Sequence, residues 1–236
     1  RLRGITEFQS FNADVTLQDF GNAHNIAINE QSGFAFVVGS NLYQGGPVFI
    51  DVNDPKKPKI VGGFDTASYT HDAQIIIYRG PDENYQGKEL LFGSNTDGGA
   101  NNKIVILDVT DKKNPEWVQS IFYENGGYTH QGYITEDHRY FFIGDELDEI
   151  NYGSPTSTRI FDLTDLSNPK LHLNYYASLS AIDHNGYTKG DKFFMASYTA
   201  GLRVLDISSI EEKQIEEIGF FDSYPSDNDT KFAGAW

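Results

Sequence analysis

Val48-Phe49-Ile50-Asp51-Val52 is the first of four related segments in this chain. In each segment a mostly apolar run leads into an Asp, and one more apolar residue and a turn follow. The other three segments are Val105-Ile106-Leu107-Asp108-Val109, Arg159-Ile160-Phe161-Asp162-Leu163 and Arg203-Val204-Leu205-Asp206-Ile207. The sequence therefore predicts one unit of β-strands that is used four times along the chain.

A His followed by a polar residue opens each unit, upstream of the segment just described. The four pairs are His24-Asn25, His71-Asp72, His130-Gln131 and His184-Asn185. Successive units are roughly 45–60 residues long, which leaves room for four strands in each. In the first unit we expect strands at 24–29, 33–39, 47–52 and 60–65.

Repeated four-stranded units of this length favour a β-propeller, which is an all-β fold. A single four-stranded sheet cannot bury both faces, whereas sheets stacked around an axis bury the faces between neighbours. We therefore expect one propeller domain, residues 1–236, with four whole blades of antiparallel strands. The expected blades lie roughly at 24–66, 71–123, 130–176 and 184–222.

Both ends of the chain are interpreted as parts of further blades. Residues 1–20 suit the end of a preceding blade, and 230–236 suit the start of a following one. Either four blades close the ring here, or the chain is an arc of a larger ring. The chain opens Arg1-Leu2-Arg3 without a Met or a signal peptide, which we interpret as a processed product or a fragment.

The composition excludes several classes of protein. Acidic residues number 34 and basic residues 18, so the formal net charge is −16. Such a surface repels phosphate backbones and anionic lipids, which argues against nucleic-acid binding and polybasic membrane attachment. The absence of cysteine excludes disulfides and thiolate metal sites. We expect no direct membrane insertion, because no apolar run approaches about 18 residues, and no organic cofactor, because no phosphate loop or dinucleotide fingerprint is present.

The repeat core resembles the LVIVD repeat of bacterial and archaeal surface proteins. Longer phrases, in order along essentially the whole chain, resemble the choice-of-anchor B family within that group. These phrases are Tyr69-Thr70-His71-Asp72-Ala73-Gln74, Tyr128-Thr129-His130-Gln131-Gly132, Gly144-Asp145-Glu146-Leu147-Asp148-Glu149, Ala181-Ile182-Asp183-His184-Asn185 and 198–207.

This resemblance implies a bacterial propeller that is extracellular, displayed on the cell surface or periplasmic, and held by a C-terminal anchor. It implies no established enzymatic activity. The family's full domain extends beyond this chain at both ends, so the resemblance also implies an arc of a ring with about seven blades.

The four unit-opening histidines, His24, His71, His130 and His184, are the first candidate site. Because the innermost strands of a propeller line its channel, these imidazoles could meet near one mouth and bind zinc or copper. The structural alternative, which we favour for a residue repeated in every blade, is that each His makes a buried hydrogen bond that holds its blade. Ring separations above about 8 Å without a shared cavity would exclude a channel site, because ligands of one ion lie much closer together.

The loop with Asp145, Glu146, Asp148 and Glu149 is the second candidate site. Four carboxylates within five residues repel one another unless a cation or solvent screens them, and hard oxygen ligands favour calcium. The spacing differs from that of an EF-hand loop, so a solvated acidic loop is the alternative. We give calcium preference over zinc or copper as the metal.

The repeated aspartates, Asp51, Asp108, Asp162 and Asp206, have a structural interpretation. An Asp at the start of a turn accepts hydrogen bonds from nearby backbone N–H groups. A pair of carboxylates could instead hydrolyse a glycosidic bond, and Asp72 and Asp183, which adjoin two of the histidines, are the pair considered.

Two functional hypotheses follow. The first is an extracellular, non-enzymatic propeller that acts as a binding or adhesion platform for a protein or carbohydrate ligand, stabilised by calcium. Exposed Tyr69, Tyr128 and Tyr187 beside the histidines could stack on such a ligand, with interblade packing as their alternative role. The second is a metal-dependent enzyme or metal-binding protein with its site in the histidine-lined channel.

Overall fold

The computed structural model describes residues 4–66, 68–97 and 102–236. Within these residues, sixteen strands form four sheets of four antiparallel strands, and the strands of each sheet follow one another in chain order. The first sheet contains β1 (Asn25–Asn29), β2 (Phe34–Val38), β3 (Val48–Asp51) and β4 (Lys59–Gly63). The second contains β5 (Tyr69–Ile77), β6 (Glu89–Thr96), β7 (Lys103–Asp108) and β8 (Glu116–Ile121).

The other two sheets repeat this pattern. The third contains β9 (Thr129–Ile134), β10 (Tyr140–Asp145), β11 (Ser157–Asp162) and β12 (Lys170–Tyr176). The fourth contains β13 (Gly186–Lys189), β14 (Lys192–Ser197), β15 (Gly201–Asp206) and β16 (Glu216–Phe221). The predicted all-β architecture of four-stranded antiparallel blades is confirmed.

Helical structure in the described residues is confined to short connections. The α-helix α1 (Asp148–Tyr152) lies between β10 and β11. Three 3₁₀ turns occupy Tyr43–Gly45, Glu83–Tyr85 and Ile210–Glu212. No helix in the described part of the chain combines the length and the hydropathy needed to cross a bilayer.

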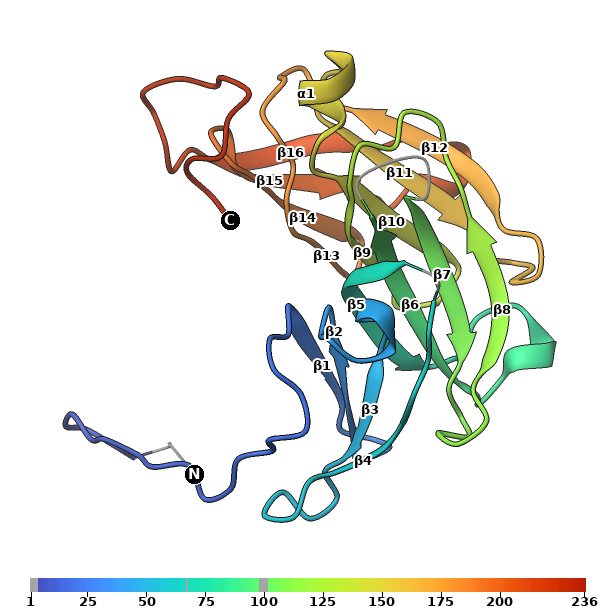
Figure 1. Cartoon of the computed structure of the whole chain (residues 1–236). Helices are drawn as coiled ribbons and strands as arrows, with labels where there is room; N and C mark the ends of the chain where they lie inside the picture. Colours follow the sequence, from blue (N-terminus) through green and yellow to red (C-terminus); the bar gives the residue numbers. More distant parts are fainter. Residues whose placement is uncertain (1–3, 67, 98–101) are drawn as a thin grey trace.

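The four sheets follow one another in a curved row, with the first and fourth sheets at its two ends (Figure 1). Their first strands lie side by side along the inner edge, because β5 packs against β1 and β9, and β9 packs against β13. The row therefore brings the beginning of each repeat unit to a common edge. This arrangement places the four unit-opening histidines next to one another.

Apolar side chains fill the space between neighbouring sheets. The core between the first and second sheets contains the fully buried Phe49. Between the second and third sheets Phe92 stacks on Phe141 with ring centroids 5.3 Å apart. Between the third and fourth, Phe142 stacks on Phe193 at 4.7 Å. Each interface buries apolar area that a single sheet would expose, so the stack of blades stabilises the individual sheets.

The repeated Asp residues end the third strand of each blade. In every blade the pairing of the third strand with the fourth shifts register between the second and the first residue before this Asp. Such a shift is the signature of a β-bulge. Each Asp Oδ1 then accepts a hydrogen bond from the backbone N–H two residues on. The donors are Asn53 for Asp51 (3.0 Å), Thr110 for Asp108 (3.0 Å), Thr164 for Asp162 (2.8 Å) and Ser208 for Asp206 (2.8 Å).

Candidate histidine site

The unit-opening histidines form a continuous row of rings across the four blades. The ring centroids of His24 and His71 lie 3.8 Å apart, those of His71 and His130 4.4 Å, and those of His130 and His184 4.2 Å. These separations are well below the limit that would exclude a channel site. The row extends along the inner edge of the sheets, where the first strands of neighbouring blades meet.

Hydrogen bonds between blades fix the orientation of two of these rings. The Nδ1 of His24 lies 2.8 Å from the carbonyl oxygen of His71, and the Nδ1 of His71 lies 3.0 Å from the carbonyl oxygen of His130. A carbonyl only accepts, so each Nδ1 carries the proton and each Nε2 keeps a free lone pair. The bonds join neighbouring blades, rather than acting within one blade, and they leave Nε2 available as a ligand.

Burial keeps His71, His130 and His184 neutral. Desolvation, together with the neighbouring His24, lowers the pKa of His71 to about 4. Desolvation and the flanking rings of His71 and His184 lower the pKa of His130 to about 2. The pKa of His184 falls to about 4 for the same main reason, its burial. The neutral imidazole is the form that binds a metal ion.

Glu146 faces the row of rings from the loop after β10. Its Oε2 lies 3.6 Å from Nε2 of His130, and its Oε1 lies 3.5 Å from Nε2 of His184. The hydroxyl of Tyr198 donates a 2.7 Å hydrogen bond to Oε1 and holds the carboxylate in place. One carboxylate and two imidazoles from the third and fourth blades thus present ligand atoms within 4.8 Å of one another.

A pocket of about 410 Å³ opens over this group. Its wall includes the four histidines, Glu146 and Tyr198. Trp236 stands at the rim, 82% exposed, with its ring centroid 5.6 Å from that of His184. Asp72 also lines the pocket, where it accepts a hydrogen bond from Asn25 and burial raises its pKa to about 6.

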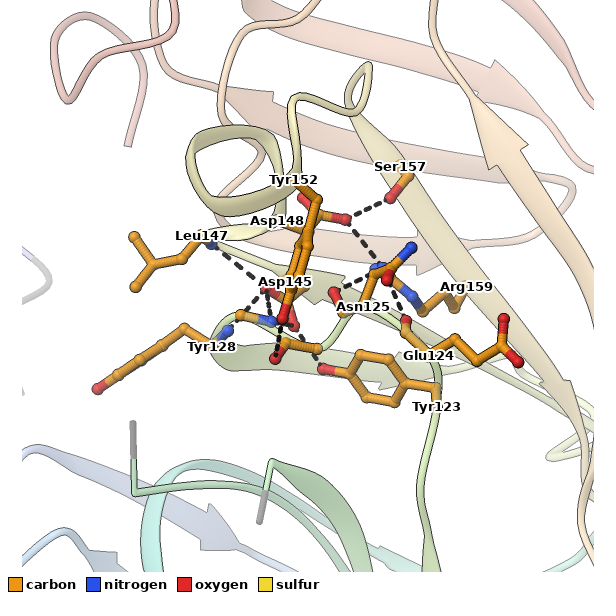
Figure 2. Close-up of polar contacts among 12 residues, drawn as sticks. Tyr123, Glu124, Asn125, Tyr128, Asp145, Leu147, Asp148, Tyr152, Ser157 and Arg159 are labelled. Carbon is orange, nitrogen blue, oxygen red and sulfur yellow. Dashed lines mark hydrogen bonds and ion pairs between the residues drawn. The ribbon is translucent and has the colours of Figure 1, made fainter. Parts of the chain in front are cut away.

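The four carboxylates predicted as a calcium loop do not meet at one point. Asp145 is fully buried and serves as an anchor for the preceding turn: it accepts hydrogen bonds from the amides of Gly127 and Tyr128 and from the hydroxyl of Tyr123 (Figure 2). Glu146 turns to the histidines, as described above. Asp148 and Glu149 lie in α1 and meet Asp183 rather than the histidines.

Asp148 and Glu149 meet Asp183, which comes from the connection between β12 and β13. The three residues are 0%, 4% and 2% exposed, and one carboxylate oxygen from each lies within 4.8 Å of the other two. Asp148 Oδ2 also accepts hydrogen bonds from Arg159 Nη2 at 2.9 Å and from Ser157 Oγ at 2.6 Å (Figure 2). Asp183, paired with Asp72 in the glycosidase hypothesis, therefore belongs to a carboxylate cluster rather than to the pocket wall.

The tyrosines next to the histidines have two different environments. Tyr69 and Tyr128 contact histidine rings, with centroids 6.4 Å from His24 and 5.2 Å from His71 respectively. Tyr187 instead packs edge-on against Tyr133 of the third blade at 5.2 Å. The tyrosine that reaches the candidate site is Tyr198, which the sequence analysis did not single out. Its place in the phrase Tyr198-Thr199, matching Tyr69-Thr70 and Tyr128-Thr129, was the available signal.

Nuclear magnetic resonance of the metal-free protein can test this electrostatic description. The imidazole carbon-bound protons of His71, His130 and His184 should keep constant chemical shifts from about pH 8 to about pH 5.5, because burial holds their pKa values far below the usual 6.5. Long-range ¹H–¹⁵N spectra should place the proton of His71 on Nδ1. A titration midpoint near 6.5 for any of the three would contradict the assigned environment.

No protein-family model matches the chain, and no curated protein sequence matches it. Solved structures do. A putative 6-phosphogluconolactonase from Bacteroides uniformis is 13% identical, with a TM-score of 0.64 over 85% of this chain and 55% of that one. Kuenenia stuttgartiensis hydrazine synthase is also 13% identical, with a TM-score of 0.59 over 80% and 53%. A chain of the nidogen/laminin complex is 14% identical, with a TM-score of 0.56 over 87% and 65%.

The chain thus spans between 53% and 65% of the length of these solved chains. At such low identity the likeness concerns the fold alone. Together with the four-stranded antiparallel blades, it identifies the architecture of this chain as that of a β-propeller.

Proposed function

We propose that this chain is a metal-binding propeller in which His130, His184 and Glu146 take a zinc or copper ion at the inner edge of the blades. The observation that supports it is the spacing of the Nε2 atoms from the two carboxylate oxygens, 3.5 and 3.6 Å. A hydrogen bond would be shorter. Ligands that share a tetrahedral zinc ion through bonds of about 2.0–2.1 Å stand about 3.3–3.4 Å apart.

The surroundings of the three groups suit this role. Burial favours neutral imidazoles, so no proton has to leave His130 or His184 at neutral pH before a metal binds. Tyr198 orients Glu146 through its hydroxyl, as groups behind a metal ligand commonly do. With Glu146 bound through one oxygen, three protein ligands would leave a fourth position free for water or for a ligand's donor atom from the pocket.

A second role is favoured by the rim of the same pocket. The exposed Trp236 offers an aromatic surface of the kind that packs against sugars and peptide side chains. With the resemblance to the LVIVD repeat and the choice-of-anchor B family, this supports a propeller displayed outside a bacterial cell as a binding or adhesion platform. A metal in the pocket would be compatible with such a platform.

Metal analysis by mass spectrometry tests the proposal on protein purified without chelator and then titrated with zinc or copper. We expect about one zinc or copper ion per chain, and less than a tenth of that in the Glu146→Gln variant. The matched control is Gln44→Glu, which changes a residue outside the pocket and should leave the stoichiometry unchanged. The proposal is contradicted if the wild-type protein holds no transition metal after purification and binds none in the titration. That result would favour the metal-free platform.

A further inference from the structure

Asp148, Glu149 and Asp183 form a second acidic group behind the histidine row, at the junction of the third and fourth blades. Asp148 and Glu149 begin α1, in the connection between β10 and β11, whereas Asp183 lies in the segment that leads from the third blade into β13. All three side chains are more than nine-tenths buried. The group therefore joins two blades at a place that solvent does not reach.

Most of the oxygens in this group lack a donor. Asp148 Oδ1, both carboxylate oxygens of Glu149, and Asp183 Oδ1 are buried, and no hydrogen-bond donor in the described residues reaches them. Buried carboxylate oxygens without partners are costly, and the three carboxylates repel one another as well. Buried carboxylate oxygens without donors indicate that a positively charged species binds between them.

The charged groups around the three carboxylates also leave a deficit of positive charge. Arg159 contacts the group through Asp148 Oδ2 at 2.9 Å, and it is the cation that the described residues supply there. With Asp145 close by, four carboxyl groups share this one guanidinium. A divalent ion would supply the missing positive charge.

We infer that Asp148, Glu149 and Asp183 bind a calcium ion that ties the third blade to the fourth. Calcium bonds to oxygen are about 2.3–2.6 Å long, so oxygens on opposite sides of one ion stand up to about 5 Å apart. One carboxylate oxygen from each of the three residues lies within 4.8 Å of the other two. The four oxygens without a donor are the ligand atoms that these side chains offer to the ion. Calcium takes six to eight oxygen ligands, among which backbone carbonyl oxygens also serve.

The burial of the group favours calcium over magnesium at this place. Magnesium prefers bonds of about 2.0–2.1 Å and keeps several of its waters, which a fully buried group of three side chains disfavours. The backbone also makes room for the acidic group: a Cβ at Gly144 in β10 would come within 2.4 Å of Asp183 Oδ2. Gly144 thus permits the carboxylate of one blade to lie directly against a strand of another.

This inference is independent of the proposed transition-metal site, since the two sites share no residue. The expected effects can be separated by variants. Glu149→Gln should abolish the response to calcium and retain zinc binding, whereas Glu146→Gln should lose zinc binding and retain the response to calcium. A negative result for zinc binding would therefore leave the calcium inference standing, and a negative result for calcium would leave the zinc proposal standing.

Thermal unfolding of chelator-treated protein, with and without about 1 mM calcium chloride, tests the inference at constant ionic strength. We expect calcium to raise the melting temperature by about 5 °C or more, which corresponds to a ligand well above its dissociation constant, and magnesium to raise it much less. The variants Glu149→Gln and Asp183→Asn should lose this shift. Without metal they should melt at or above the metal-free wild type, because each removes one of the repelling charges. Glu30→Gln, an exposed acid in the first blade, is the matched control and should keep the full shift.

Terbium luminescence, excited through nearby tyrosines, gives a second readout that needs no variant. We expect terbium to bind saturably and calcium to displace it. A melting temperature that calcium leaves unchanged would overturn the inference, as would a calcium shift that survives in both Glu149→Gln and Asp183→Asn. Stabilisation by acid but not by calcium would show that a shared proton, rather than a metal ion, neutralises the group.

Discussion

Replacing Glu89 by Ala is expected to lower the free energy of unfolding by about 3–5 kcal/mol. Glu89 begins β6 and is 3% exposed. Its Oε2 lies 2.6 Å from Nζ of Lys112, which is also buried, and its Oε1 accepts hydrogen bonds from Asn29 and Ser32 at 2.6 Å each. One carboxylate thus holds a turn of the first blade against the second.

The large effect comes from what the substitution leaves behind. Without Glu89, the ammonium group of Lys112 remains in a buried place without its counter-charge, and the nearby Phe34 ring, 4.4 Å away, compensates only part of this cost. The urea concentration at the midpoint of unfolding should fall. The slope of the unfolding free energy against urea concentration should stay the same.

Two further variants make this prediction specific. The double variant Glu89→Leu with Lys112→Met removes both charges and should recover most of the lost stability. Lys57→Ala removes one member of the exposed 4.0 Å pair with Asp54 and should cost less than about 1 kcal/mol. A loss below about 1 kcal/mol in Glu89→Ala would contradict the role assigned to this buried ion pair.

The second large effect is expected at the histidine site. His184→Asn should lower the affinity for zinc by more than about 100-fold, because it removes one of three proposed ligands, and changes behind a ligand alone cost about 10–100-fold. The measurement is a competition titration against a chromophoric chelator. Circular dichroism of the variant would verify that the blades remain folded.

The matched control for this variant is His138→Asn. His138 lies away from the histidine row, in the turn between β9 and β10, and its φ of 57° is in the left-handed region that Asn tolerates well. This control should bind zinc like the wild type. Equal zinc affinities for His184→Asn and the wild type would exclude His184 as a ligand.

The sequence predicted the blades because each repeat unit contains its own strand pattern. The apolar run before Asp51 and the turn after it recur at Asp108, Asp162 and Asp206, and a local pattern of this kind is sufficient to place strands. The stacking of the sheets follows from the two apolar faces that every unit presents. The β-bulge before each Asp was not predicted, because it depends on how the third and fourth strands pair.

The candidate sites were less accessible to sequence reasoning because they join distant residues. Repetition indicated that the histidines lie at equivalent positions, and this brought them to one edge. Sequence position could not indicate that Glu146 reaches His184, which is 38 residues further along. Nor could it predict that the carboxylates of one acidic loop contact three different partners, or that Asp183 lies against Glu149. These contacts depend on how two blades dock, which no local pattern encodes.

Anomalous X-ray diffraction at the zinc absorption edge, from crystals equilibrated with zinc, locates any bound zinc ion directly. We expect a single strong anomalous peak about 2 Å from Nε2 of His130, Nε2 of His184 and the Glu146 carboxylate. Zinc peaks only at surface side chains, with the histidine row unchanged, would contradict this expectation.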